Sequence, residues 1–192
     1  DLALPPDKGP ITGTLAITGL ELKALGANSR FFEGVKTFPV VASASTSFRV
    51  AADNSLVFAA FDITAHGDVP FAPAGSKVLK ISNLRLVGRY EGPSHHLVLS
   101  TADLQARGVK ARLKGAGDFI YDASGSLERV RAELSGREIA LDMPSLFPQP
   151  VAYQTLAVAA DYLTGPRQFD ITRFNVTAPG FALDASGTVT LN

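Results

Sequence analysis

A strict alternation of apolar and polar side chains is the feature of this sequence that most constrains its fold. Between residues 181 and 191 the odd-numbered positions carry only apolar side chains or glycine: Phe181, Leu183, Ala185, Gly187, Val189 and Leu191. The even-numbered positions carry alanine, aspartate, serine or threonine. Residues 109–121 show the same period, with Lys110, Arg112 and Lys114 on the polar side. Because successive side chains of a β-strand point to opposite faces, this period predicts strands with one dry and one wet face.

Turn residues divide the chain into strands of similar length. Glycine, proline, aspartate and serine suited to tight turns stand at 91–94, 122–125, 164–166 and 178–180. The runs between them predict strands at 78–90, 96–106, 109–121, 127–142, 154–163, 167–178 and 181–191. Upstream, we expect a hairpin from Phe38–Ala52 and Ser55–Val69, a shorter one from Ile11–Thr18 and Leu20–Leu25 turning at Gly19, and one helical turn at Arg30–Glu33.

Tight connections between consecutive strands predict an antiparallel meander. We therefore expect a mainly β protein whose long strands form a curved sheet, a groove or an open sandwich, with few short helices. Two connecting stretches, Pro70–Ser76 and the proline-rich Met143–Pro150, mark the expected boundaries. They delimit an N-terminal β-hairpin region (1–76), a first β repeat unit (77–142) and a second, truncated unit (143–192).

A pattern that recurs at an offset of 72 residues supports this division. Without a gap, Tyr90 aligns with Tyr162, and Gly108 with Gly180. Leu84 likewise aligns with Leu156, Ala106 with Ala178, and Gly115 with Gly187. Repeated β units usually stack into elongated structures rather than enclosing a catalytic pocket, so the repeat favours binding, scaffolding or conduction.

Composition excludes several classes of function. The chain has 192 residues, 46% of them hydrophobic, and its 18 basic side chains balance 18 acidic ones, so nucleic acid is not an expected partner. It has no cysteine, which excludes thiol catalysis, disulfides and thiolate metal sites. No run approaches the roughly 20 apolar residues that span a bilayer. Because the sequence stops within the strand-like run 188–192, we expect it to be a segment of a longer protein.

Candidate chemical groups are few. His95 and His96 adjoin each other in a predicted turn, where a solvated turn is favoured over a metal site because no ligand spacing accompanies them. Asp161, Asp170 and Asp184 lie on predicted polar faces, where solvated carboxylates are favoured over a glycosidase pair. The basic stripe of Lys110, Arg112 and Lys114 is either the wet face of a sheet or a contact for lipid phosphate. We expect no enzyme activity, no cofactor and no metal.

The predicted dry face is the most unusual feature of this chain, because a large apolar surface must be shielded from water by something that packs against it. The sequence leaves two covers open: a second layer that makes an ordinary core, or acyl chains taken up by a trough. The candidate lining residues come from both repeats: Leu84, Leu86, Tyr90, Leu97, Leu99, Val109, Leu113 and Phe119 from the first, and Leu156, Val158, Tyr162, Phe169, Ile171, Phe181, Leu183 and Val189 from the second.

A resemblance to a known family bears on this choice. The second repeat reads Leu156-x-Val158-x-Ala160, then a Gly-Pro turn, Phe169-Asp170-Ile171-x-x-Phe174-x-Val176, and Pro179-Gly180-Phe181-x-Leu183-x-Ala185-x-Gly187-x-Val189. This sequence pattern resembles the repeat of the AsmA-like superfamily of repeating β-groove proteins, the AsmA/TamB/YhdP type. The resemblance covers about residues 78–192, and Phe61-Asp62-Ile63 echoes it upstream.

The resemblance implies a location and a role. Members of that family are Gram-negative envelope proteins, anchored in the inner membrane with their bulk in the periplasm, and their grooves are viewed as bridges for phospholipid towards the outer membrane. By this resemblance the chain is a non-catalytic periplasmic segment of a longer protein. Its expected partners are acyl-chain lipid and the neighbouring modules of the same parent chain. Contact with the membrane is expected through parts of the parent chain that lie outside this segment. The alternative is a structural or adhesive β-repeat module whose apolar face is only a packed core.

Overall fold

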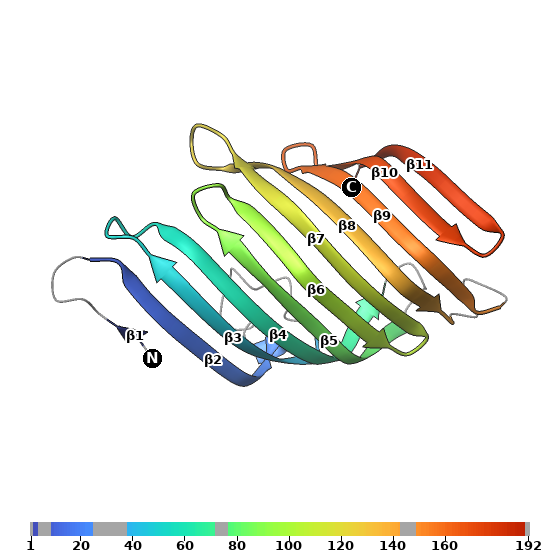
Figure 1. Cartoon of the computed structure of the whole chain (residues 1–192), viewed down its shortest axis with the longest axis horizontal. Coiled ribbons are helices and arrows are strands. Elements are labelled where there is room, and N and C mark those ends of the chain that lie inside the picture. The colour runs from blue at the N-terminus through green and yellow to red at the C-terminus, as the bar shows by residue number, and fades with distance from the viewer. Residues whose placement is uncertain (1, 4–8, 25–37, 72–76, 143–148, 191–192) are drawn as a thin grey trace.

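The protein folds as one antiparallel sheet in which the strands follow one another in chain order (Figure 1). The computed structural model describes residues 2–3, 9–24, 38–71, 77–142 and 149–190. The strands are β1 (Leu2–Ala3), β2 (Ile11–Glu21), β3 (Val40–Val50), β4 (Leu56–Phe71), β5 (Lys77–Glu91), β6 (His96–Ala106), β7 (Val109–Tyr121), β8 (Leu127–Leu141), β9 (Val151–Leu163), β10 (Gln168–Ala178) and β11 (Phe181–Thr190). The expected mainly β meander is confirmed.

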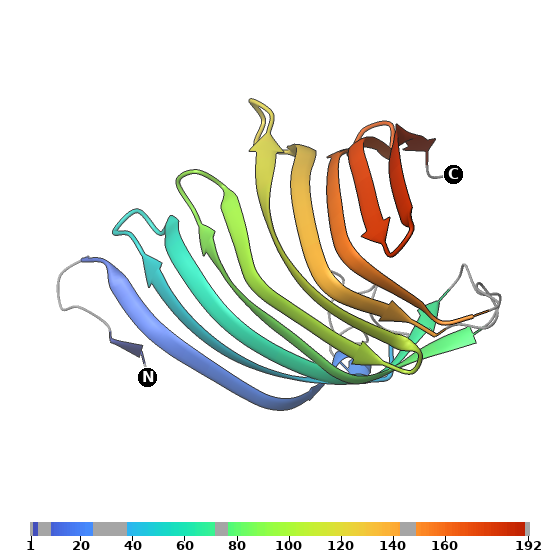
Figure 2. The ribbon, with the colours of Figure 1, turned by 45° about the vertical axis from the view of Figure 1, so that its right-hand side comes forward.

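The sheet is strongly curved and open, and its first and last strands do not meet (Figures 1 and 2). All eleven described strands belong to this single sheet, so no second sheet among the described residues lies across either face. Within the same residues no helix has both the length and the apolar character needed to cross a membrane.

The turn chemistry placed most strand boundaries correctly. β6 and β7 occupy the predicted ranges, and β5, β8 and β10 differ from theirs by a residue at one or both ends. β11 follows its predicted range as far as Thr190, and Leu191 lies outside the described residues. β9 begins three residues earlier than predicted. β4 also extends further than predicted, through Pro70 and Phe71. The pairing of β3 with β4 ends at Gly67, so one side of β4 is an edge beyond that point, where a proline is tolerated.

The predicted hairpin that turns at Gly19 is wrong, because residues 11–21 form one continuous strand. Gly19 has a φ of 66° and lies at a register shift between Ile17 and Leu20, so it forms a bulge and not a turn. Its backbone N–H donates to Ser43 Oγ at 3.2 Å. The helical turn predicted at Arg30–Glu33 lies outside the described residues.

The stretch predicted to separate the two repeat units does not interrupt the sheet. β8 and β9 lie on either side of it and pair from Arg129↔Leu163 to Leu141↔Val151. β4 and β5 pair in the same way across the other predicted boundary. Residues 143–148 and 72–76 lie outside the description, and the strands that flank them are neighbours in one sheet.

The 72-residue offset reappears in the backbone. β10 (168–178) lies 72 residues after β6 (96–106) at both ends. The left-handed conformations of His95 and Gly108 recur at Arg167 and Gly180. A register shift between Leu99 and Ala102 recurs between Ile171 and Phe174. The repeat therefore preserves turns and bulges as well as residue types.

Candidate functional site

The sixteen candidate lining residues all lie on one face of the sheet. Side chains of directly paired residues share a face, and faces alternate along each strand. Starting from Leu113, the register passes through Ala102 to Leu86, and through Gly136 to Leu156 and Val176. Following every strand from these positions places all sixteen residues on the side of Leu113, here named the apolar face. The opposite side, which carries Arg112, is named the polar face.

The apolar face contains uninterrupted rows that cross the sheet from β2 to β11 at right angles to the strands. One row of directly paired residues runs from β2 to β11: Ile17, Ala44, Ile63, Leu86, Ala102, Leu113, Gly136, Leu156, Val176 and Leu183. Neighbouring strands lie about 4.8 Å apart, so the row is about 43 Å long. Among the register-paired residues whose side chains are described, this face holds no Asp, Glu, Lys or Arg. The rows form one apolar track.

Several residues of this track were missed by the sequence pattern. In β6 the bulge after Leu99 moves the apolar positions from odd to even numbers, which adds Ala102 and Leu104 to the face. In β10 the equivalent bulge adds Phe174 and Val176. The change of parity in the apolar residues was the available signal. The N-terminal strands β2–β4 also contribute, through the residues Leu15, Ile17, Phe48, Phe61 and Ile63.

Crowding identifies the apolar face as the inner side of the curve. Bending a sheet brings together the side chains of its concave face and spreads those of its convex face. The buried apolar residues of the described chain all lie on the apolar face: Val40, Ala102, Ala111, Ile139 and Val176. The rings of Tyr90 on β5 and Phe119 on β7 reach across β6 to a centroid distance of 6.0 Å.

Glycines make room for this convergence. A Cβ built on Gly88 would lie 2.7 Å from Cζ of Phe61, and one on Gly136 would lie 2.5 Å from Cδ2 of Leu113. Large apolar side chains of the neighbouring strands therefore lean over these positions. The floor of the track alternates between large side chains and glycines that they partly cover.

Despite this packing, much of the track is exposed. Among the described residues no apolar side chain of large volume is fully buried. Several large side chains of the apolar face are exposed, and most of them lie towards the two ends of the sheet: Leu15, Ile17, Leu56, Tyr121, Leu134, Phe169, Phe181, Leu183 and Val189. Phe181 keeps 51% of its surface and Leu15 keeps 53%. The described part of the chain leaves this face without the second layer that an ordinary core requires.

The two adjacent histidines lie where the chain turns from β5 into β6, and they take different partners. His95 Nδ1 lies 3.0 Å from Tyr90 Oη, and its ring contacts Tyr121 at a centroid distance of 4.8 Å. His96 Nδ1 lies 2.6 Å from Asp118 Oδ1 on β7. No group of three or more His, Cys, Asp or Glu in the described part of the chain is placed to hold a metal ion. Burial is the main reason that the pKa of Tyr90 is raised.

The polar face carries the carboxylates that sequence reasoning had noted. Asp161 and Asp170 are directly paired across β9 and β10. Asp161 is held by Arg131, with Nε to Oδ1 at 3.2 Å, and Asp170 accepts from Gln168 Nε2 at 2.6 Å. Asp184 faces the same side on β11. Each of the first two carboxylates is thus engaged in a cross-strand or local contact.

Comparisons with protein-family models, with curated proteins and with solved structures found no match. The function must therefore be inferred from the geometry of the sheet.

Proposed function

We propose that this chain is a non-catalytic lipid-binding segment whose apolar track holds the acyl chains of phospholipid. The observation that carries the proposal is the continuous row from Ile17 to Leu183 on the crowded inner face of an open sheet. The resemblance to the AsmA-like superfamily supplies the setting: a periplasmic part of an envelope protein that carries phospholipid between inner and outer membranes, joined to neighbouring modules of the same parent chain.

The dimensions of the track suit an acyl chain. One leaflet of a bilayer has a hydrocarbon thickness of about 15 Å, half of the roughly 30 Å core. The row of about 43 Å is longer than this, so a chain can lie along the track in several overlapping positions. A lipid can then move along the track in small steps, since the register-paired residues present no charged side chain to mark a fixed site.

The hydrophobic effect supplies a sufficient driving force. Each methylene removed from water contributes about 0.8 kcal/mol. An open track covers one side of an acyl chain, so about 15 methylenes that are half covered contribute roughly 6 kcal/mol. The same contact covers exposed side chains such as Phe169 and Phe181. Head groups remain at the open rim in contact with water.

Photocrosslinking combined with mass spectrometry tests the proposal. A photoreactive phenylalanine analogue is placed at Leu99 or Leu156, on the apolar face, and at the matched positions Val98 or Ala157, one residue along the chain on the polar face. We expect phospholipid to crosslink at the first pair and not at the second.

Lipid retention provides an independent measurement. An organic extract of the purified protein is analysed by mass spectrometry for the wild type, for a variant carrying Leu99→Asp and Ile171→Asp, and for the control Val98→Asp. We expect co-purifying phospholipid to decrease in the double variant and to persist in the control, with circular dichroism showing that all three fold. A lipid-free wild type that gives no crosslink at Leu99 or Leu156 would exclude the proposal and favour the structural module with a packed core.

A further inference from the structure

Most charged side chains on the polar face are paired with a partner of opposite sign. Arg85 Nη2 lies 2.7 Å from Asp62 Oδ2, and Arg89 contacts Glu91 at 2.9 Å. On the later strands Arg131 contacts Asp161. Such pairs leave little net charge over most of this face, in keeping with a chain of zero formal charge.

The centre of the polar face, on β7 and β8, departs from this pattern. The register places Arg112 directly opposite Arg137, and like charges in that relation destabilise a sheet. Arg112 is neutralised by two carboxylates, with Nε to Asp103 Oδ1 at 3.2 Å and Nη1 to Glu138 Oε2 at 3.8 Å. Arg137 and the exposed Lys114 make no ion pair within the described part of the chain.

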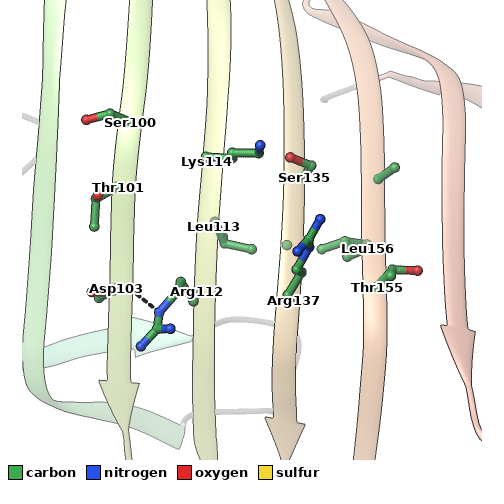
Figure 3. Close-up of a pocket in the computed structure, with 12 residues that line it drawn as sticks. Ser100, Thr101, Asp103, Arg112, Leu113, Lys114, Ser135, Arg137, Thr155 and Leu156 are labelled. Atoms are coloured by element: carbon green, nitrogen blue, oxygen red, sulfur yellow. Dashed lines mark hydrogen bonds and ion pairs between the residues drawn. The ribbon is translucent and has the colours of Figure 1, made fainter.

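A hollow of about 570 Å³ lies among these cations (Figure 3). Lys114 and Arg137 lie beside it, with the Arg112–Asp103 pair at one edge (Figure 3). Ser135 contributes a hydroxyl group to the lining, whereas the hydroxyl of Thr155 lies 2.5 Å from Thr177 Oγ1 on β10. A twisted sheet is saddle-shaped, so a shallow hollow on the polar face is compatible with an apolar face that is concave in the other direction. The hollow thus combines the positive charge of Lys114 and Arg137 with the hydroxyl group of Ser135.

We propose that this hollow binds a phosphate group. The planar guanidinium of Arg137 matches two phosphate oxygens, while the ammonium group of Lys114 acts as a compact charge beside it. A phosphate dianion supplies the negative charge that Lys114 and Arg137 do not receive from any described side chain. The hollow also has room for the molecule that carries the phosphate, either a soluble phosphate ester or a lipid head group. The site lies on the opposite face from the apolar track and does not depend on the proposed function.

A titration of the whole chain with inorganic phosphate tests this site. The backbone amide signals are followed by NMR at constant ionic strength, with sodium chloride as the control anion. We expect saturable shifts at Lys114, Ser135 and Arg137, with a Kd on the order of 1 mM, because exposed charge pairs contribute modestly. The variant carrying Lys114→Gln and Arg137→Gln is expected to bind about 10-fold more weakly. Arg49→Gln, which removes one exposed charge from the same face on β3, is the matched control.

Vesicles distinguish the two sources of phosphate. If the ligand is a lipid head group, phosphatidylglycerol vesicles will sediment the wild type more strongly than phosphatidylcholine vesicles do, and the double variant will lose that difference. If it is a soluble ester, phosphate will bind and the two kinds of vesicle will behave alike. Shifts that chloride reproduces, or phosphate binding that is equal in the wild type and the double variant, would overturn the proposal.

Discussion

Gly115 and Gly187 provide a direct test of how the apolar face is packed. They lie 72 residues apart, at equivalent places on β7 and β11, and both face the track. A Cβ at Gly115 would lie 2.4 Å from the carbonyl oxygen of Glu133 and 2.6 Å from Leu134 Cδ2. A Cβ at Gly187 would meet nothing within 4 Å. The same substitution therefore has opposite consequences at two positions that the sequence makes equivalent.

The magnitudes follow from these contacts. In Gly115→Ala the backbone of β8 must move, since a carbonyl oxygen cannot rotate away as a side chain can, and overpacking of this kind costs about 1–3 kcal/mol. In Gly187→Ala the new methyl enters open space, and the reduced freedom of the unfolded chain stabilises the protein by about 0.4–1 kcal/mol. The variants should differ by about 1.5–4 kcal/mol in free energy of unfolding, with about 2–4 °C in Tm for each kcal/mol.

Urea unfolding followed by circular dichroism measures this difference in a chain that has no tryptophan. The wild type and both variants are compared at equal m-value, so that a shift in midpoint reports stability. Equal destabilisation by the two substitutions would refute the reasoning. It would mean that a packed layer covers β11, contrary to the exposure of Phe181 and Val189.

Two further predictions concern stability. Arg85 donates hydrogen bonds to the carboxylate of Asp62, which lowers the pKa of Asp62 below its usual value of 3.8. Hydrogen bonds from Ser124 and Ser126 lower the pKa of Asp122 in the same way. The stability that these two carboxylates contribute is present above their unfolded pKa and is lost as the pH falls through their lower folded pKa. We therefore expect the urea midpoint to decrease when the pH is lowered below about 4, and to decrease less in the Asp62→Asn variant. Val176→Ala should cost about 1–2 kcal/mol, because Val176 is 6% exposed, whereas Val189→Ala, at 49% exposed, should change the thermal midpoint little.

The alternation predicted the strands because it records directly which side of the sheet each residue faces. Where the alternation ended at a tight turn, as at Gly108 and Gly180, the ends of the strands could be predicted as well. Gly19 shows the limit of this reasoning. A glycine with positive φ serves a hairpin turn or a bulge equally well, and only the pairing of β2 with β3 across it decides between them.

The polar contacts were harder to predict because they depend on register. A hairpin closed at Arg107–Gly108 pairs residues whose numbers sum to 215, as Ala106 and Val109 do. The bulge in β6 lowers this sum to 214, so His96 pairs with Asp118 and not with Phe119. A one-residue shift thus decides whether a histidine faces a carboxylate or an aromatic ring. The opposition of Arg112 and Arg137 depends on a similar shift between Lys110 and Arg112.

The recurring bulges give the 72-residue repeat a physical role. A bulge bends its strand and increases the local twist, and it also moves the next side chain to the other face. In β6 and β10 the apolar sequence changes parity at the bulge, so the side chains on both sides of the bend still face the track. A flat sheet with the same alternation would need a second sheet to cover it. A sheet bent at the same place in each repeat instead brings its own apolar side chains together and keeps their rows aligned from strand to strand. It also leaves one side of the apolar face open, which is the arrangement that the proposed binding of acyl chains requires.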